Sequence, residues 1–372
     1  MPELNYSIDD LLGQMVARGA SDLHVTVGAP PTIRVRGHLE RLEGYEPLVA
    51  EDTMQLFYRI ISSEQQKNLE IKRQIDFAHH VPGVARFRVN IFFQRGSVSA
   101  AFRRVPHQIP DLDSLRVPQI LRDFTRKPRG FVLVTGPTGS GKSTTLASML
   151  DIINAEREEH ILTIEDPIEF LHSHKRCIVN QREIGADAED FASALKAALR
   201  EDPDVILVGE MRDLETMSTA LTAAETGHLV FATLHTQSTA QTVDRIIDIF
   251  PAQQQAQVRM QLSIGLQGII TQQLLPTVDG AGRVVAVEVL VPTPAVRNLI
   301  REGKTHQIYS AIQTSGSLGM QTMDAHLASL VRMGRISRKL AEQRASVPEE
   351  LKRLLGTAGG NGAVAPAVTG GG

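Results

Sequence analysis

Residues 131–145 have the glycine-rich pattern that binds nucleotide phosphates. The apolar run Phe131 to Val134 predicts a buried strand, and residues 147–153 have helical spacing, so the loop between them joins a strand end to a helix start. Glycines in such a loop allow backbone N–H groups to face phosphate oxygens at the positive end of the helix. A chance glycine turn is the alternative, and the strand–loop–helix context argues against it. The predicted phosphate-binding residues are Gly136, Pro137, Thr138, Gly139, Ser140, Gly141, Lys142, Ser143 and Thr144.

Two side chains of this loop have distinct expected roles. Lys142 is long enough to reach the β- and γ-phosphates, and the hydroxyl of Ser143 is suited to ligate Mg²⁺. The expected cofactors are therefore ATP and Mg²⁺.

Two further predicted strands end in carboxylates. An apolar strand at 204–209 leads into Glu210, which can orient or deprotonate an attacking water; a solvated strand-end carboxylate is the alternative. A strand at 160–165 ends in Glu165, which we expect at the same sheet edge. Sequence does not separate their roles, so Ser143, Glu165 and Glu210 are all candidate metal ligands, and Glu165 and Glu210 are candidate catalytic groups. For Asp166 and Glu169, capping of the next turn and a direct catalytic role both remain open.

Two histidines flank the predicted strand at 229–234. His235 follows its C-terminal end, where it can contact the γ-phosphate and report hydrolysis to the next helix. For His228 a structural role and a functional role fit equally well. Both are candidate catalytic residues.

Arginines cluster on the strands before the middle of the chain. Developing phosphoryl charge needs a cation, and nucleotide motors often supply an arginine from a neighbouring element. Alternation places Arg86 and Arg88 on one strand face, and Arg103 follows on a later strand. These three are candidates to reach a nucleotide across an interdomain or intersubunit cleft. A solvated, charged sheet face is the alternative for each of them.

The elements that position these residues fall into two predicted domains. Residues 1–106 are expected to form a small α+β domain with helices at 7–19 and near 51–69, and residues 107–118 a proline-bracketed linker. Strands and helices then alternate as in a parallel α/β sheet over 119–350, with helices from about 294 to 345, and 351–372 should be a disordered Gly-rich tail. The predicted strands are 23–27, 32–36, 75–79, 85–92, 97–103, 131–135, 160–165, 204–209, 229–234 and 283–291.

Composition narrows the functional classes. Net charge is −3 over 372 residues, with no overall basic bias, which argues against a nucleic-acid translocase. The single cysteine, Cys177, excludes an intramolecular disulfide and a cysteine-based zinc site. No apolar run approaches the ~20 residues that span a bilayer, and the N-terminus lacks a signal-peptide pattern. We therefore expect a soluble, cytoplasmic protein.

Together these segments resemble the secretion-type ATPase superfamily, and within it the type IV pilus retraction ATPases, over residues 7–350. The stretch 136–145 is similar to the family's Walker A motif, 163–170 to its Asp box, 204–216 to its Walker B motif and 227–236 to its His box. The stretches 20–24 and 83–90 are similar to its PAS-like N-terminal domain. Residues 295–302 resemble a signature of retraction ATPases, with Val296 where isoleucine is common.

The resemblance implies a RecA-like P-loop ATPase domain preceded by a PAS-like domain. It also implies a homohexamer that binds nucleotide between the two domains and acts on an inner-membrane pilus platform protein from the cytoplasmic face. The chain lacks the cysteines of the zinc insertion common in assembly-type relatives, so the resemblance favours retraction. An accessory retraction ATPase is a possible further partner. The alternative functions are that the chain is itself such an accessory ATPase or a nucleotide-regulated ring scaffold; Glu165 and Glu210 together argue against the scaffold.

Overall fold

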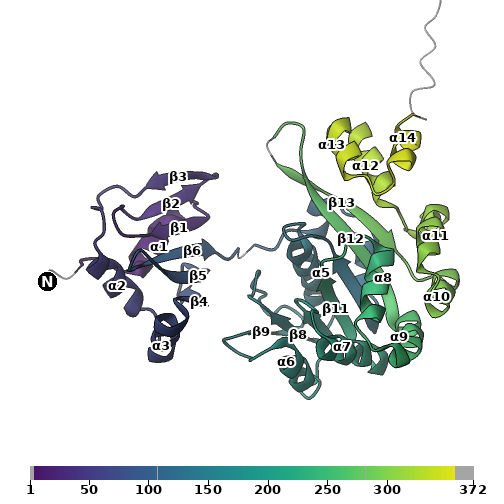
Figure 1. Ribbon diagram of the computed structural model, residues 1–372, viewed down its shortest axis with the longest axis horizontal. Helices are drawn as coiled ribbons and strands as arrows, with labels where there is room; N and C mark the ends of the chain where they lie inside the picture. Colours follow the sequence, from purple (N-terminus) through teal and green to yellow (C-terminus); the bar gives the residue numbers. More distant parts are fainter. Residues whose placement is uncertain (1–3, 107, 281, 357–372) are drawn as a thin grey trace, which may run out of the picture. The chain divides into compact units, whose positions relative to one another are not determined.

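The computed structural model describes residues 4–106, 108–280 and 282–356, and it divides the chain into two compact units (Figure 1). Unit 1 comprises Met1–Gln108, Asp166–His172 and Glu183–Glu189; unit 2 comprises Ile109–Glu165, Ser173–Arg182 and Asp190–Gly372. The predicted division at residues 107–118 therefore needs two changes. The segments 166–172 and 183–189 group with unit 1, where Glu183 pairs with Arg86. Most of the predicted linker belongs to unit 2, because Leu112 is buried in that unit's core.

Unit 1 is built on an antiparallel sheet of six strands in the order β3-β2-β1-β6-β5-β4. Helix α1 begins at a capping box in which Ser7 and Asp10 bond reciprocally, and it buries one apolar stripe against the sheet's core. Strand β5 buries Phe87 and Val89, so Arg86 and Arg88 share its other face as predicted. The elements are α1 (Ile8–Ala17), β1 (Asp22–Val25), β2 (Thr32–Val35), β3 (His38–Arg41), α2 (Ala50–Tyr58), α3 (Ser63–Lys72), β4 (Gln74–Val81), β5 (Ala85–Gln94) and β6 (Ser97–Arg104).

The single helix predicted near 51–69 was wrong, because two helices occupy this region. Helix α2 ends at Tyr58, and α3 starts anew after Ser62. The Ser62 side chain accepts a hydrogen bond from Gln65 N, and Ser62 N donates to Gln65 Oε1 at 2.8 Å. This Ser-x-x-Gln capping box is a helix-start signal that lies within the predicted helix.

Unit 2 contains a seven-stranded sheet in the order β13-β12-β7-β11-β10-β8-β9. Strands β12, β7, β11, β10 and β8 run parallel, whereas β13 pairs antiparallel with β12. The α/β class is confirmed, but strands β9 and β12 were missed. The elements of the sheet and the helices between its strands are α4 (Ile120–Thr125), β7 (Gly130–Thr135), α5 (Lys142–Glu156), β8 (His160–Glu165), β9 (Ile178–Glu183), α6 (Phe191–Ala198), β10 (Val205–Val208), α7 (Leu214–Thr226), β11 (Leu229–Leu234), α8 (Thr239–Asp248), α9 (Ala252–Gly265), β12 (Leu266–Pro276) and β13 (Arg283–Leu290), with a 3₁₀ turn at Leu112–Leu115.

The C-terminal helices of unit 2 gather beside the β12–β13 hairpin and along α8 and α9 (Figure 1). They are α10 (Pro294–Arg301), α11 (Ile308–Thr314), α12 (Met323–Arg332), α13 (Arg338–Arg344) and α14 (Pro348–Gly356), with 3₁₀ turns at Thr305–Gln307 and Gly316–Leu318. Residues 351–356, predicted to start the tail, belong to α14, where Leu351 is buried in a core shared with β13. The predicted disorder of 357–372 lies outside the described residues. Among the described helices, none is long and apolar enough to cross a membrane.

Buried Glu288 in β13 joins the starts of two helices. Its carboxylate accepts hydrogen bonds from Thr239 N and Thr239 Oγ1, both at 2.8 Å, at the first residue of α8, and from the backbone N–H of Met323, the first residue of α12. Burial raises its pKa above the ordinary value of 4.5, and the nearby Asp324 adds to the effect. The folded state therefore binds the Glu288 proton more tightly than the unfolded state does.

Replacing Glu288 by glutamine is expected to change how stability depends on pH. On account of Glu288, the wild type loses stability as pH rises from 4.5 through the raised pKa of the folded state. The free energy of unfolding of Glu288→Gln, relative to wild type, should therefore increase across that window, by at most about 1.4 kcal/mol per pH unit. Glu288→Ala should cost about 1–3 kcal/mol, because Thr239 loses its acceptor. Urea unfolding at several pH values tests both; equal slopes for wild type and Glu288→Gln would contradict the prediction.

Candidate nucleotide site

The predicted phosphate loop lies between the end of β7 and the start of α5. Gly136 has φ 138° and is buried, and a Cβ added there would lie 2.2 Å from the Gln272 carbonyl oxygen of β12. Gly141, with φ 90°, is the N-cap of α5. Position 136 has no room for a side chain, and the positive φ angles at 136 and 141 favour glycine at both positions. The sequence interpretation of this segment as strand, glycine loop and helix is confirmed.

The N-terminus of α5 offers an uncompensated positive end. The helix is 15 residues long, no side chain caps its first turn, and its first turn contains no acidic residue. Its first backbone N–H groups therefore remain suited to bind an anion. Of the predicted phosphate-binding residues, Ser143 is exposed in the first helical turn, Thr144 is half-buried, Pro137, Thr138 and Gly139 are exposed in the loop, and Ser140 is buried.

Lys142 lies over its own loop. Its Nζ donates to the carbonyl oxygens of Gly136, at 2.9 Å, and Pro137, at 3.2 Å. Burial lowers the pKa of Lys142, while the charge of Glu210 acts in the opposite direction. The ammonium group is thus held at the loop, with a carboxylate close enough to interact with it.

Glu210 and His235 come together at the carboxyl edge of the sheet. His235 Nε2 lies 2.8 Å from Glu210 Oε1, and Arg212 Nε donates to the same oxygen at 2.5 Å. Burial raises the pKa of Glu210, but the hydrogen bonds and charges of Arg212 and His235 outweigh it, so the pKa is below its ordinary value. Glu210 is therefore an ionised carboxylate at neutral pH. Arg212 was missed as a site residue, although it lies two positions after Glu210 in the sequence.

Glu165 ends β8 at the same edge. Strand β8 pairs with β10, with Ile164 opposite Val208, so Glu165 and Glu210 follow neighbouring strands. Glu165 Oε1 accepts hydrogen bonds from Thr163 Oγ1 at 2.7 Å and Gln181 Nε2 at 3.1 Å. Its oxygen is thereby oriented by β8 and β9.

The structure does not bring His228 to this edge. His228 precedes β11 at its N-terminal end, whereas His235 follows the C-terminal end, about 20 Å away along a six-residue strand. The Nδ1 atom of His228 lies 3.0 Å from the Ala223 carbonyl oxygen at the end of α7. This position favours the structural alternative for His228, because a side chain that starts a parallel strand lies at the opposite edge from the phosphate loop.

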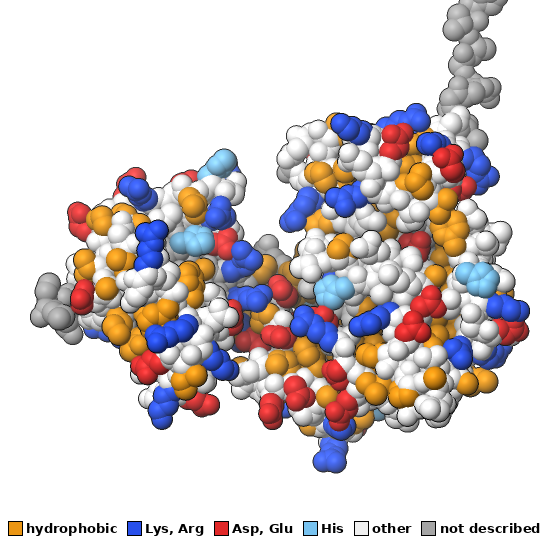
Figure 2. Space-filling view, viewed as in Figure 1, with side chains coloured by type: hydrophobic (Ala, Val, Ile, Leu, Met, Phe, Trp, Pro, Cys, Tyr) orange, Lys and Arg blue, Asp and Glu red, His pale blue; other side chains and the backbone are white. Residues whose placement is uncertain are grey.

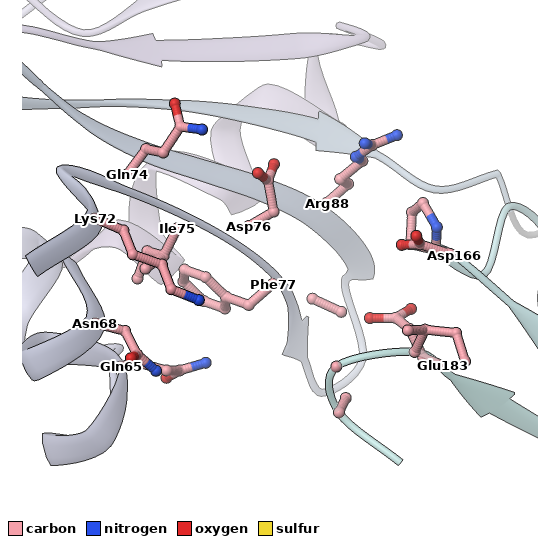
Figure 3. Close-up of a pocket in the computed structure, with 15 residues that line it drawn as sticks. Gln65, Asn68, Lys72, Gln74, Ile75, Asp76, Phe77, Arg88, Asp166 and Glu183 are labelled. Carbon is pink, nitrogen blue, oxygen red and sulfur yellow. The ribbon is translucent and has the colours of Figure 1, made fainter. Parts of the chain in front are cut away.

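The three candidate arginines lie in unit 1, and two have acidic partners there. Arg86 pairs with Glu183 at 3.0 Å, and Arg103 pairs with Asp22 at 2.8 Å. Arg88 is exposed and lines a cavity of about 500 Å³ within unit 1. Figure 3 shows Arg88 on its strand, with Asp166 and Glu183 opposite it. Asp166 and Glu169 are both exposed members of unit 1.

A second cavity, of about 460 Å³, opens beside the phosphate loop in unit 2. It is lined by the loop and the first turn of α5 on one side, and by the β12–β13 hairpin on the other. Its lining includes Gln272, Leu274, Arg283 and Arg335, none of which the sequence analysis identified. These residues come from strand β12, which was missed, from the hairpin, and from the turn after α12, so no local motif marked them.

The donor set at this edge fits Mg²⁺. Among the described residues, no group of three or more His, Cys, Asp or Glu side chains could hold a metal ion by itself. Mg²⁺ in nucleotide sites is usually held by few protein oxygens together with phosphates and waters. The exposed hydroxyl of Ser143 and the ionised carboxylate of Glu210, which interacts with the neighbouring Lys142, are oxygens of this kind. Ser143 and Glu210, with Glu165 on the neighbouring strand, are the residues that would hold it.

A glycine loop at a helix N-terminus, with a lysine on the loop and a carboxylate–histidine pair at the same sheet edge, defines a P-loop nucleoside triphosphatase. Residues 3–281 match the family model described as Type II/IV secretion system protein. The chain is 54% identical to the type IV pilus retraction ATPase PilT of Pseudomonas aeruginosa over 342 residues, 92% of this chain and 99% of that protein. It is 50% identical to a twitching motility protein of Neisseria gonorrhoeae over 346 residues, 93% of this chain and 92% of that protein.

A crystal structure of the pilus retraction motor PilT with bound ADP matches this fold with a TM-score of 0.88 and 52% identity, covering 94% of this chain and 100% of the other. The chain belongs to the type II/IV secretion system family, as a PilT-type ATPase. The expected RecA-like ATPase fold and the assignment as an ATPase are confirmed.

Proposed function

We propose that the protein is an ATP-hydrolysing motor that powers retraction of type IV pili. The observation that carries the proposal is the similarity to pilus retraction ATPases along nearly the whole of both chains. The site supports it, because the loop, Lys142, Glu210 and His235 supply the groups that a motor needs to bind and hydrolyse ATP.

Each site residue has a defined proposed role in hydrolysis. The loop N–H groups and the start of α5 bind the phosphates, and Lys142 leaves its two loop carbonyls to pair with phosphate oxygens. Glu210 orients the attacking water and accepts its proton at the carboxylate. His235, bonded to Glu210 four residues before α8, passes the change at Glu210 to that helix. Mg²⁺, when bound, neutralises charge on the phosphates and the transferred phosphoryl group.

The cavity of about 460 Å³ is the proposed site of the nucleoside part of ATP. It begins at Gly141 and Thr144, beside the start of the phosphate-binding helix, and it has apolar walls from Leu274 and Val285. Arg283 and Arg335 supply cations at its polar side. A nucleotide with its phosphates at the loop would extend into this space.

The proposed working form is a homohexamer at the cytoplasmic face of the inner membrane, where it acts on the pilus platform protein. In such a ring Arg88, exposed in unit 1, is the candidate to serve a nucleotide of a neighbouring subunit, with Arg86 and Arg103 held by their acidic partners. The charge distribution supports a protein partner over nucleic acid, because basic and acidic side chains are interspersed on the visible face of each unit (Figure 2).

Helix α10 covers residues 295–301 of the stretch that resembles the retraction signature; it packs on the core and also contacts helix α9. Val296 and Ile300 are buried, and Arg297 donates to the carbonyl oxygens of Ser263, Ile264 (2.8 Å) and Leu266 (3.1 Å) at the C-terminal end of α9. A motion of α10 would therefore carry the end of α9 with it.

Two measurements test the proposed function. The purified protein is expected to hydrolyse ATP as a hexamer, measured by phosphate release together with mass in solution. Its gene is expected to restore twitching motility to a pilus-bearing strain that lacks its own retraction ATPase. Turnover and a ring without restored motility would favour an accessory ATPase, and nucleotide binding without turnover would favour a regulatory scaffold; either outcome would overturn the motor proposal.

A further inference from the structure

Gln272 lies directly against the phosphate loop. It belongs to β12, whose Thr271 pairs in register with Thr135, the last residue of β7. The side chain of Gln272 is fully buried, at 0% exposure, although it is polar. Its Nε2 donates to the Ser140 carbonyl oxygen at 2.8 Å, and this is a bond between the adjacent strand and the loop itself.

The loop fits closely around this residue. A Cβ at Gly136 would lie 2.2 Å from the Gln272 carbonyl oxygen, and one at Gly141 would lie 3.2 Å from its Nε2. The hydroxyls of Thr135 and Thr271 lie 2.8 Å apart, which fastens β7 to β12 immediately before the loop. Gln272 thus contacts both ends of the glycine loop, through its backbone at Gly136 and through its side chain at Ser140 and Gly141.

The bond to Ser140 fixes the direction of one peptide group. In a planar trans peptide the C=O and the following N–H point in opposite directions. Because the Ser140 carbonyl points at Gln272, the N–H of Gly141 points away from β12, at the N-cap of α5 where the helix presents its positive end. A phosphate at that end would meet this N–H already oriented.

We propose that Gln272 is a positioning residue for phosphate binding: its side-chain amide holds the Ser140–Gly141 peptide so that the Gly141 N–H faces the phosphates. The inference rests on the proposed nucleotide site. The Gly141 N–H is expected to bind the polyphosphate part of the nucleotide and not the nucleoside. Among the described residues, Gln272 Oε1 and Ser140 Oγ are buried without a hydrogen-bond partner. The hydrogen bond from Gln272 Nε2 to the Ser140 carbonyl oxygen is therefore the polar contact that the test removes.

The test compares Gln272→Met with Gln273→Met. Methionine keeps the length of the side chain but cannot donate to Ser140, and Gln273, the next residue of the same strand, is half-buried on the opposite face. Affinities for ATP and for inorganic tripolyphosphate are measured, with thermal unfolding as the check on folding. Gln272→Met is expected to weaken both ligands by the same factor, roughly tenfold, while Gln273→Met leaves both unchanged.

A second variant keeps the test decisive if Gln272→Met folds poorly. In Gln272→Glu a protonated carboxyl can donate to the Ser140 carbonyl and an ionised one cannot. Its tripolyphosphate affinity, divided by that of wild type at the same pH, should therefore fall as pH rises. A ratio that does not change with pH, or a loss of ATP affinity with tripolyphosphate unaffected, would overturn the inference. Wild-type protein that binds neither ligand would instead overturn the proposed nucleotide site.

Discussion

Replacing Glu210 by glutamine is expected to lower kcat for ATP hydrolysis by roughly 10²- to 10⁴-fold and to change ATP affinity by only a few fold. Glutamine keeps the size of the side chain and one oxygen that can accept the bonds from Arg212 and His235. It cannot accept a proton from the attacking water. The substitution therefore removes proton transfer from the water, which stabilises the transition state more than the bound ATP, so kcat falls more than ATP affinity does.

The pKa of Glu210 determines the pH range in which this carboxylate works. Its pKa lies below the ordinary value, so the group is ionised throughout the neutral range, and the contribution of Glu210 to turnover is lost only as pH falls through that lowered pKa. The matched control is Glu215→Gln, an exposed glutamate five residues later that pairs with Lys196. Multiple-turnover ATPase assays of both variants provide the test. Full activity in Glu210→Gln would show that another group handles the water, with Glu165 the next candidate.

The sequence predicted the site best where chemistry depends on consecutive residues. The phosphate loop, Glu210 and His235 each follow an apolar strand within two residues, so the strand pattern alone placed them at one sheet edge. The strand pattern did not separate His228 from His235, because both lie next to the same strand and only the direction of the strand places them at opposite ends. A motif that spans a strand does not place all of its residues at one site.

The parts that sequence missed depend on contacts between distant segments. Strand β12 follows helix α9 without a break, and its Gln-Gln pair gives no strand signal, so neither Gln272 nor the cavity it lines was predicted. Residues 183–189 group with unit 1, and Glu183 in this segment pairs with Arg86, 97 residues away in the sequence. Arg86 lies on the strand face that the sequence predicted, but its pairing with the buried Glu183 could not be predicted because the two residues meet only in the folded chain.

Lys142→Ala is expected to weaken ATP binding by about 10- to 150-fold, the range for loss of a charged hydrogen-bond donor. In the structure the ammonium donates to the carbonyl oxygens of Gly136 and Pro137, so it sits where phosphate oxygens would approach the loop. Alanine removes the cation and leaves the backbone N–H groups of the loop in place. Binding of a fluorescent ATP analogue measures the effect, with exposed Lys196→Ala as the matched control.

The stability of the variant distinguishes a ligand role from a structural one. Burial lowers the pKa of Lys142, which means that the folded protein bears a desolvation cost for this charge. Removing the side chain relieves that cost, which stabilises the fold, but it also leaves two loop carbonyls without this donor, which destabilises the fold. The free energy of unfolding without nucleotide should therefore change little, while the stabilisation that ATP adds should largely disappear. A variant that unfolds readily but still gains full stabilisation from ATP would show that Lys142 holds the loop together and does not bind the phosphates.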